Sequence, residues 1–202
     1  MDIPPIRFLT GPRLYLRPVE ASDLGACQRW VNDPDIRRYI LRAFPVNAAS
    51  EAAWFERSTA DSGDKSVTFS IVLIDGERHI GTTGLHAIDW FHRRAESGAL
   101  IGEKELWNRG YGKEAKALLL RYAFEELGLH RIDSRVVGYN LRSARHLEAN
   151  GYVLEGRRRL AIYKEGEWHD ELQYGILASE YFARKSALAL VGQLPESSAP
   201  LD

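Results

Sequence analysis

The chain has 202 residues, of which 45% are hydrophobic and 27% charged, as expected for a globular protein with one well-packed core. Its formal net charge of -1 gives no overall attraction to nucleic acid or to a membrane surface. The single cysteine, Cys27, excludes an internal disulfide and a thiolate metal cluster, and its spacing predicts a buried helical position. Residues 1–13 show neither a basic leader nor a long apolar run, so we expect a cytoplasmic protein.

The first sixty residues predict one strand, at residues 13–19, followed by a cap of short helices. The expected helices are one capped by Ser22 or Asp23 and ending near Val31, one over residues 36–41, and one capped by Asn47 or Ser50. Pro34 and Pro45 separate these helices, because proline lacks the amide hydrogen that a helix interior needs.

The middle of the chain predicts antiparallel strands and the rest alternates strands with helices. Asp75-Gly76 is a strong turn signal between two β-branched runs. The expected elements are strands at 67–74, 79–88 and 94–102, a helix at 113–127 ended by Gly128, a strand at 132–137, a helix at 141–150 capped by Asn140, and a hairpin around Gly166 with a return strand at 172–177. From about Lys185 the chain is rich in Ala, Ser and Pro, which suggests an appendage of uncertain order.

The loop between the third of these strands and the long helix, Trp107-Asn108-Arg109-Gly110-Tyr111-Gly112-Lys113, is the most informative segment. Two glycines without a Cβ let the backbone turn tightly and bring its amide hydrogens close to a ligand, and a helix start points more amide hydrogens at the same place. Arg109 and Lys113 would be disfavoured at a helix start unless an anion lay between them. The alternative is an ordinary glycine turn with solvated basic side chains.

Several landmarks in order resemble the GNAT superfamily of N-acetyltransferases, in particular its ribosomal-protein N-terminal acetyltransferase branch. They are Leu9-Thr10-Gly11-Pro12-Arg13-Leu14-Tyr15-Leu16-Arg17, Trp30-Val31-Asn32-Asp33-Pro34, Gly84-Leu85-His86-Ala87-Ile88-Asp89-Trp90, Gly110-x-Gly112, Arg131, Asn140-x-x-Ser143, Gly151-Tyr152 and Trp168-His169-Asp170-Glu171. The resemblance covers residues 8–182 and leaves 183–202 as a C-terminal extension. It implies a mixed α/β fold, in which a mostly antiparallel twisted sheet contains a central, splayed parallel strand pair and is flanked by helices.

The resemblance also implies acetyl transfer from acetyl-CoA to a primary amine, either a protein N-terminal α-amine or a small-molecule amine, without a metal. The amine would attack directly in a ternary complex. The residues implied in cofactor binding are Leu100, Ile101 and Gly102 for the pantetheine arm, Asn108, Arg109, Gly110, Tyr111, Gly112 and Lys113 for the diphosphate, and Asn140 and Ser143 beside the arm. The oligomeric state is left open, with a homodimer among the alternatives.

Proton transfer needs a base for the attacking amine and an acid for the departing thiolate. Glu96 is the first candidate base, because it precedes Gly110 by 14 positions as in relatives, and Glu103 is the second. Each could instead be a solvated carboxylate. In many relatives a tyrosine acid lies seven residues beyond the asparagine, but here that position is Leu147, so Ser143 is the substitute candidate.

The acceptor site is implied by segments that face the cleft in relatives. They contribute Trp30, Asp33, His86, Asp89 and Trp90. Either aspartate could balance the charge of a cationic amine, although each could equally be a turn or helix-end residue.

Two other classes fit parts of the sequence. Gly110-x-Gly112-x-x-Ala115 with Asp133 matches a relaxed dinucleotide-binding fingerprint, but residues 103–109 separate the strand from the glycines and antiparallel hairpins precede them. A catalytically silent CoA-binding module is the other alternative, suggested by Leu147. The six histidines form no metal-ligand spacing, so no metal site is expected.

Overall fold

The computed structural model describes residues 6–60 and 64–192, which form one eight-stranded sheet with flanking helices. The strands are β1 (Leu9–Thr10), β2 (Leu14–Pro18), β3 (Val67–Leu73), β4 (His79–Asp89), β5 (Arg94–Ile101), β6 (Arg131–Val137), β7 (Val153–Lys164) and β8 (Glu167–Leu177). They lie in the spatial order β1-β2-β3-β4-β5-β6-β8-β7. All neighbours are antiparallel except β5 and β6, which confirms the expected mixed α/β class with one parallel pair.

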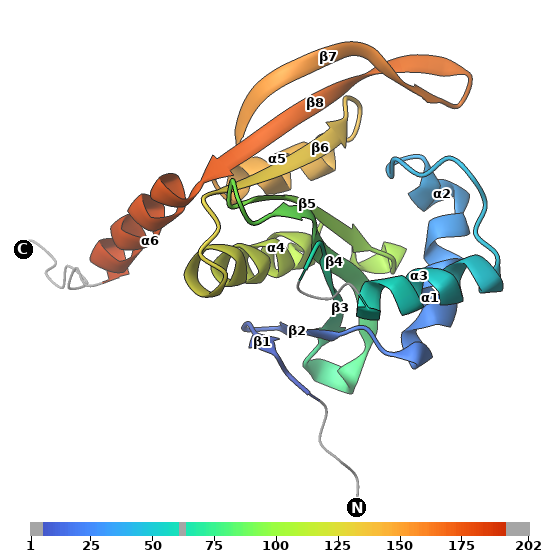
Figure 1. Ribbon diagram of the computed structural model, residues 1–202, viewed down its shortest axis with the longest axis horizontal. Helices are drawn as coiled ribbons and strands as arrows, with labels where there is room; N and C mark the ends of the chain where they lie inside the picture. The colour runs from blue at the N-terminus through green and yellow to red at the C-terminus, as the bar shows by residue number, and fades with distance from the viewer. Residues whose placement is uncertain (1–5, 61–63, 193–202) are drawn as a thin grey trace, which may run out of the picture.

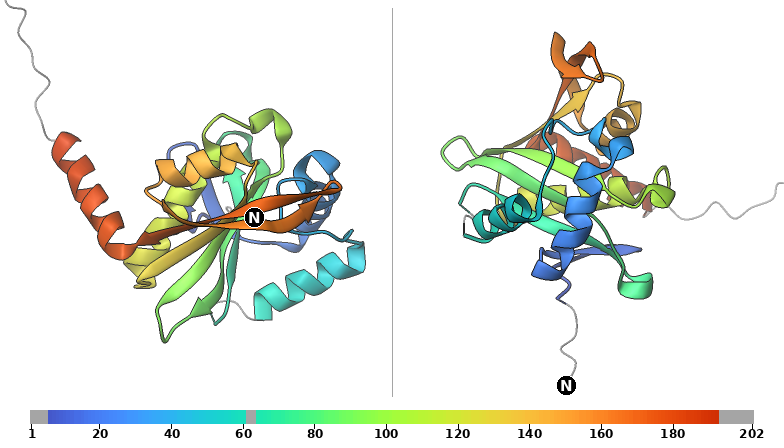
Figure 2. Two further views of the ribbon diagram at one scale, coloured as in Figure 1. Left: turned by 90° about the horizontal axis from the view of Figure 1, so that it is seen from above. Right: turned by 90° about the vertical axis from the view of Figure 1, so that its right-hand side faces the viewer.

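Six α-helices lie around this sheet in the described part of the chain (Figure 1). They are α1 (Leu24–Asn32), α2 (Pro34–Arg37), α3 (Ala48–Ala60), α4 (Tyr111–Arg121), α5 (Leu141–Ala149) and α6 (Ala178–Gly192). The first three lie together at one end of the molecule, and α6 leaves the opposite end of the sheet, as Figure 1 and the left panel of Figure 2 show. Within the described ranges no helix is long and apolar enough to span a bilayer.

The parallel pair β5–β6 is splayed, and this opening positions the site. Pairing joins only Arg94–Glu96 with Arg131–Asp133, although β5 continues to Ile101 beside β4 and β6 continues to Val137 beside β8. At the start of the opening two serine hydroxyls bridge the parting strands, since Ser97 Oγ lies 3.3 Å from the Asp133 carbonyl and Ser134 Oγ lies 3.1 Å from the Ser97 carbonyl. The backbone beyond Ser97 is therefore free of a strand partner on the β6 side.

A continuous apolar core holds α4 against the sheet. Ile71, Ile80 and Ile132 from three strands are fully buried together with Leu119 of α4. Burying each such side chain contributes roughly 1.5–3 kcal/mol, so this packing fixes the start of α4 relative to the opening between β5 and β6.

Several sequence predictions are confirmed at the level of caps and turns. Asn47 caps α3 by accepting the Ser50 amide at 2.8 Å, and Asn140 caps α5 by accepting the Ser143 amide at 3.2 Å. Gly76 and Gly166 adopt the positive φ values of 72° and 86° in the two expected hairpins.

Two helices differ from their predicted bounds. Helix α2 spans only Pro34–Arg37 instead of residues 36–41, because the Asp33 side chain caps it early by accepting the Asp35 amide at 2.8 Å. Helix α4 begins at Tyr111 and continues as a π-helical turn, Tyr122–Glu126, which buries both Ala123 and Phe124.

The C-terminal segment also differs from the sequence expectation. Helix α6 continues through the predicted boundary at residue 182 and through Lys185 to Gly192. Tyr181 and Lys185 both contact Glu125, with Lys185 Nζ 2.7 Å from its carboxylate, so the helix is tied to the turn after α4. The remaining predicted appendage, residues 193–202, lies outside the described residues.

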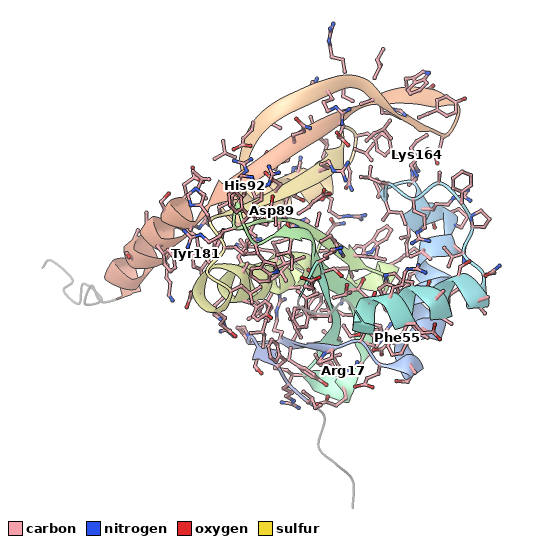
Figure 3. The ribbon with its side chains drawn as sticks, in the orientation of Figure 1. Arg17, Phe55, Asp89, His92, Lys164 and Tyr181 are labelled. Atoms are coloured by element: carbon pink, nitrogen blue, oxygen red, sulfur yellow. The ribbon has the colours of Figure 1, made fainter. Side chains whose placement is uncertain are left out.

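The β7–β8 hairpin arches over the sheet toward α2 (Figure 3). At its tip Lys164 donates to the Arg42 carbonyl at 2.8 Å and to the Arg37 carbonyl at 3.3 Å. Glu165 pairs with Arg38 at 3.0 Å. These contacts join the hairpin to the helical cap and close one side of the space in front of the splayed strands.

Candidate active site

The glycine loop before α4 has the geometry of an anion seat. Asn108 and Gly110 adopt left-handed φ values of 62° and 83°, and Gly110 is the N-cap of α4 without a capping side chain. The first amide hydrogens of α4 therefore point outward without a side-chain acceptor, where the helix dipole favours negative charge. Arg13 and Glu114 brace the loop from behind, with Arg13 Nε 2.7 Å from the Glu114 carboxylate.

A cavity of about 390 Å³, here called the α4 pocket, opens in front of this loop. Its charged and titratable lining residues are Lys113, Arg142, Arg145 and His146, with no carboxylate among them. Converging amide hydrogens together with cationic side chains suit a diphosphate group, so the residues present fit the CoA that the sequence implied.

Arg142 and Arg145 were not predicted from the sequence. The Arg142 guanidinium lies 3.9 Å from the Trp107 ring centroid and 5.0 Å from that of Tyr39. Burial between these rings lowers the pKa of Arg142 from its ordinary value. The sequence could have indicated them, because they are three residues apart on the helix predicted after Asn140 and residues at this spacing lie on the same face of a helix.

A second cavity of about 360 Å³, here called the sheet pocket, lies across the opening between β5 and β6. It is lined by residues from α1, α3, β3, β4, β5, β6, α4 and α5. Both pockets share Leu100, Asn140, Ser143 and His146 in their walls. Two ligands bound in the two pockets would therefore meet at the splayed strands.

Glu96 and His86 face each other in the sheet pocket as paired residues of β5 and β4. The Glu96 carboxylate also accepts Arg135 Nε at 3.0 Å and remains partly open to solvent. The His86 side chain is exposed at the pocket, and partial desolvation of its ring by the surrounding protein lowers its pKa. A neutral histidine and an accessible carboxylate are therefore available to an incoming amine.

Two further nitrogen bases line the sheet pocket where α4 and α5 approach the opening. Lys116 of α4 is 1% exposed and burial lowers the pKa of its amine to about 7. His146 of α5 is mostly enclosed, and burial, with a smaller contribution from Lys116, lowers its pKa to about 4. Neither residue was predicted. A lysine near the start of a helix is usually exposed, and only the packing of other elements around Lys116 makes it buried.

Most of the predicted cofactor residues lie around the α4 pocket. The structure places there Leu100, Ile101, Asn108, Gly110, Tyr111, Gly112, Lys113, Asn140 and Ser143. Two predicted residues lie elsewhere. The Gly102 amide donates to the Ile80 carbonyl at 2.8 Å while the Trp30 ring occupies the space of a Cβ, and Arg109 uses its carbonyl to accept Arg13 at 2.9 Å.

Of the predicted acceptor residues, only Trp30 and His86 line the sheet pocket. Asp33 caps α2 and pairs with Lys104 at 2.9 Å, and that bond lowers its pKa. Asp89 and Trp90 belong to the β4–β5 turn, where Asp89 accepts the His92 amide at 3.0 Å and the Trp90 indole donates to the Asp64 carbonyl at 2.7 Å (Figure 3). These three side chains serve the local turns around them.

Glu103, the second candidate base, lines neither pocket. Its carboxylate accepts the Trp30 indole at 3.0 Å and Arg29 at 3.0 Å, and it also pairs with Arg78. Three donors from separate elements hold this group, which is the arrangement of a structural anchor for α1. Leu147, at the position where the family resemblance implied a tyrosine, is 1% exposed and belongs to the core, whereas Ser143 lines both pockets.

Comparisons with known proteins agree with this geometry. A family model described as an acetyltransferase (GNAT) domain matches residues 13–153. The uncharacterised N-acetyltransferase p20 of Bacillus licheniformis is 31% identical over 172 residues, 84% of this chain and 95% of p20. Spermidine N(1)-acetyltransferase of Vibrio cholerae is 26% identical over 174 residues, 85% of this chain and 97% of that protein.

A solved structure repeats the fold over nearly all of its own length. The crystal structure of the Vibrio cholerae spermidine N-acetyltransferase in complex with CoA and spermine superposes with a TM-score of 0.78 and 25% identity, covering 84% of this chain and 98% of that one. The chain therefore belongs to the GNAT family and is an acetyl-CoA-dependent N-acetyltransferase.

Proposed function

We propose that the protein acetylates a primary amine of a small molecule by direct attack in a ternary complex, with CoA in the α4 pocket and the acceptor in the sheet pocket. The observation that carries this proposal is that the two pockets share the residues at the splayed strands, including Leu100 and Ser143. Acetyl-CoA supplies an activated acyl carbon and a thiolate leaving group. No residue has to store the acyl group, because both reactants reach the same place.

The chain contributes binding and orientation on the cofactor side. Amide hydrogens from Asn108 to Lys113 and the start of α4 would hold the diphosphate, with Arg142 and Arg145 beside it. Backbone groups of Leu100 and Ile101, which lack a β6 partner, would hold the pantetheine arm as a strand would. The Asn140 side chain uses its oxygen to cap α5, so its amide nitrogen stays available to this arm.

On the acceptor side, Glu96 is the proposed proton acceptor. It faces the sheet pocket beside neutral His86, and Arg135 fixes its orientation without enclosing it. Ser143 is the proposed proton donor at the junction of the pockets. Glu103 is withdrawn as an alternative base, since its carboxylate is held by three structural donors.

The acceptor class can be tested by following CoA thiol release with a panel of small primary amines and short peptides with free N-termini. We expect turnover with small amines and a product heavier by one acetyl group. The relative bound to spermine supports this acceptor class. Turnover confined to the peptides would replace it with a protein N-terminus. Acetyl-CoA binding without thiol release across the panel would favour a catalytically silent module.

A further inference from the structure

Two buried charged side chains line the sheet pocket without a hydrogen bond or ion pair in the described part of the chain. Glu51 of α3 is 6% exposed, and Lys116 of α4 is 1% exposed. Buried ionisable groups are nearly always paired, because leaving water without a partner costs several kcal/mol. They come from helices on different sides of the pocket, so their charges mark two different ends of the space.

The Glu51 end is suited to a cation. Glu51 follows the cap of α3, where the helix dipole favours a carboxylate but does not explain why it is buried. Burial raises the pKa of Glu51 above its ordinary value. Trp54, one helical turn further on, and the buried Trp30 of α1 line the same pocket. An aromatic ring beside the carboxylate would add to its attraction for an ammonium group.

Among the described residues, Arg42 is the cation whose charge acts on Glu51. It lines the sheet pocket and opposes the rise in the pKa of Glu51, but no nitrogen of Arg42 comes within 4.0 Å of a Glu51 oxygen. Its main-chain carbonyl is held by Lys164 at 2.8 Å, which fixes the backbone of this segment. The carboxylate is thus left with an open position that a ligand cation can take.

The Lys116 end disfavours a cation. Its amine lies 6.0 Å from the Tyr152 ring centroid, and its charge contributes to lowering the pKa of His86 on β4 and of His146 on α5. Glu96 also lines the pocket, and its carboxylate is already paired with Arg135 at 3.0 Å. A nitrogen placed here meets mostly positive or neutral groups, so an acceptor amine is stabilised in its unprotonated, nucleophilic form.

We propose that the acceptor is an aliphatic diamine, or another amine with a second cationic centre, whose distal ammonium binds Glu51 beside Trp30 and Trp54 while its reacting nitrogen lies at the splayed strands beside Lys116. This inference rests on the proposed use of the sheet pocket for the acceptor. It assigns Glu51 as a specificity-determining residue of that pocket.

The test compares α,ω-diamines of four to eight carbons with the monoamines of equal length in CoA thiol release. For the wild-type chain we expect an optimum chain length, and a kcat/KM for that diamine about thirtyfold above its monoamine, roughly 2 kcal/mol. Glu51→Gln should lower this ratio of kcat/KM values at least about tenfold by raising the KM for the diamine. The kcat/KM values for the monoamines should not change. Glu56→Gln, an exposed change on the same helix, is the matched control and should behave as wild type.

A second measurement does not depend on turnover. The optimal diamine should raise the thermal unfolding midpoint of the wild-type chain and of Glu56→Gln, but not that of Glu51→Gln. Equal kcat/KM values for diamine and monoamine, or a Glu51→Gln loss shared by both, would overturn the inference while leaving amine acetylation intact. If no amine causes thiol release, the proposed function is wrong. The role of Glu51 in diamine binding is then tested by the shift of the unfolding midpoint alone.

Discussion

The two pockets are lined by different kinds of chemical group. The α4 pocket presents main-chain amides and the cationic groups of Lys113, Arg142 and Arg145, all from two consecutive helices and the loop before one of them. The sheet pocket is lined instead by side chains from many elements, including the buried and unpaired Glu51 and Lys116. A ligand that every family member shares can be held by backbone geometry, whereas a particular acceptor requires particular side chains.

We therefore expect the buried Lys116 of the sheet pocket to lower the free energy of unfolding, whereas the side chains of the α4 pocket should not. Burial lowers the pKa of Lys116 to about 7, whereas the unfolded chain keeps about 10.4. The folded state therefore carries the full cost below pH 7, the cost shrinks as pH rises between these values, and it vanishes above the unfolded pKa. Lys116→Met should raise the free energy of unfolding at pH 7 by up to about 4 kcal/mol.

Denaturant unfolding at pH 6 and pH 9.5 measures this effect, and the gain from Lys116→Met should shrink at the higher pH. Lys65→Met, an exposed change, is the control and should alter stability by less than about 0.5 kcal/mol at either pH. A gain independent of pH would mean that Lys116 is not buried in its neutral form.

The backbone character of the α4 pocket is tested by Gly110→Val. Gly110 has a φ of 83°, a region that β-branched residues avoid, so valine would turn the loop amides away from the diphosphate. We expect the KM for acetyl-CoA to rise about hundredfold, which corresponds to roughly 3 kcal/mol. Gly128→Val is the matched control, since Gly128 has a φ of 63° after α4 but lines neither pocket.

Both glycine variants should lose similar stability, because both impose the same backbone strain. Only Gly110→Val should weaken acetyl-CoA binding measured by calorimetry. Equal binding losses in the two variants would show that the effect comes from general destabilisation of α4.

The proton acceptor in the sheet pocket is tested by Glu96→Gln. Glutamine keeps the shape and can still meet Arg135, but it cannot take a proton from the acceptor. Turnover should fall about thirtyfold below the pKa of the acceptor ammonium and recover above it, where the amine is already neutral. Activity unchanged across pH would remove Glu96 from the proton path.

The side-chain contribution to the α4 pocket is expected to be smaller. Arg142→Met removes a guanidinium 3.9 Å from the Trp107 ring centroid but leaves the loop amides in place. The KM for acetyl-CoA should rise about tenfold, with a weaker dependence on ionic strength than in wild type. An unchanged salt dependence would indicate that this guanidinium does not face the bound anion.

The same difference explains what the sequence could reveal. The glycine loop, the Asn140 cap and the antiparallel neighbours β3, β4 and β5 depend on local spacing, so they were predictable. The pairing of β6 with β8 joins strands that are not consecutive and was not predicted. Glu51 and Lys116 are unusual only because other elements of the fold bury them. The residues near them in the sequence do not reveal this burial, so neither could be predicted. His146, next to Leu147 in the sequence, lines both pockets and was not predicted.

Glu103 is a predicted base whose contacts in the structure favour a structural role. Its carboxylate accepts the Trp30 indole and Arg29, each at 3.0 Å, and so anchors α1 to the end of β5. Glu103→Gln should lower the free energy of unfolding by about 1 kcal/mol, since charge-assisted bonds become neutral ones, and should leave the pH profile of turnover unchanged. A shifted pH profile with unchanged stability would return Glu103 to the proton path and move the acceptor site toward α1.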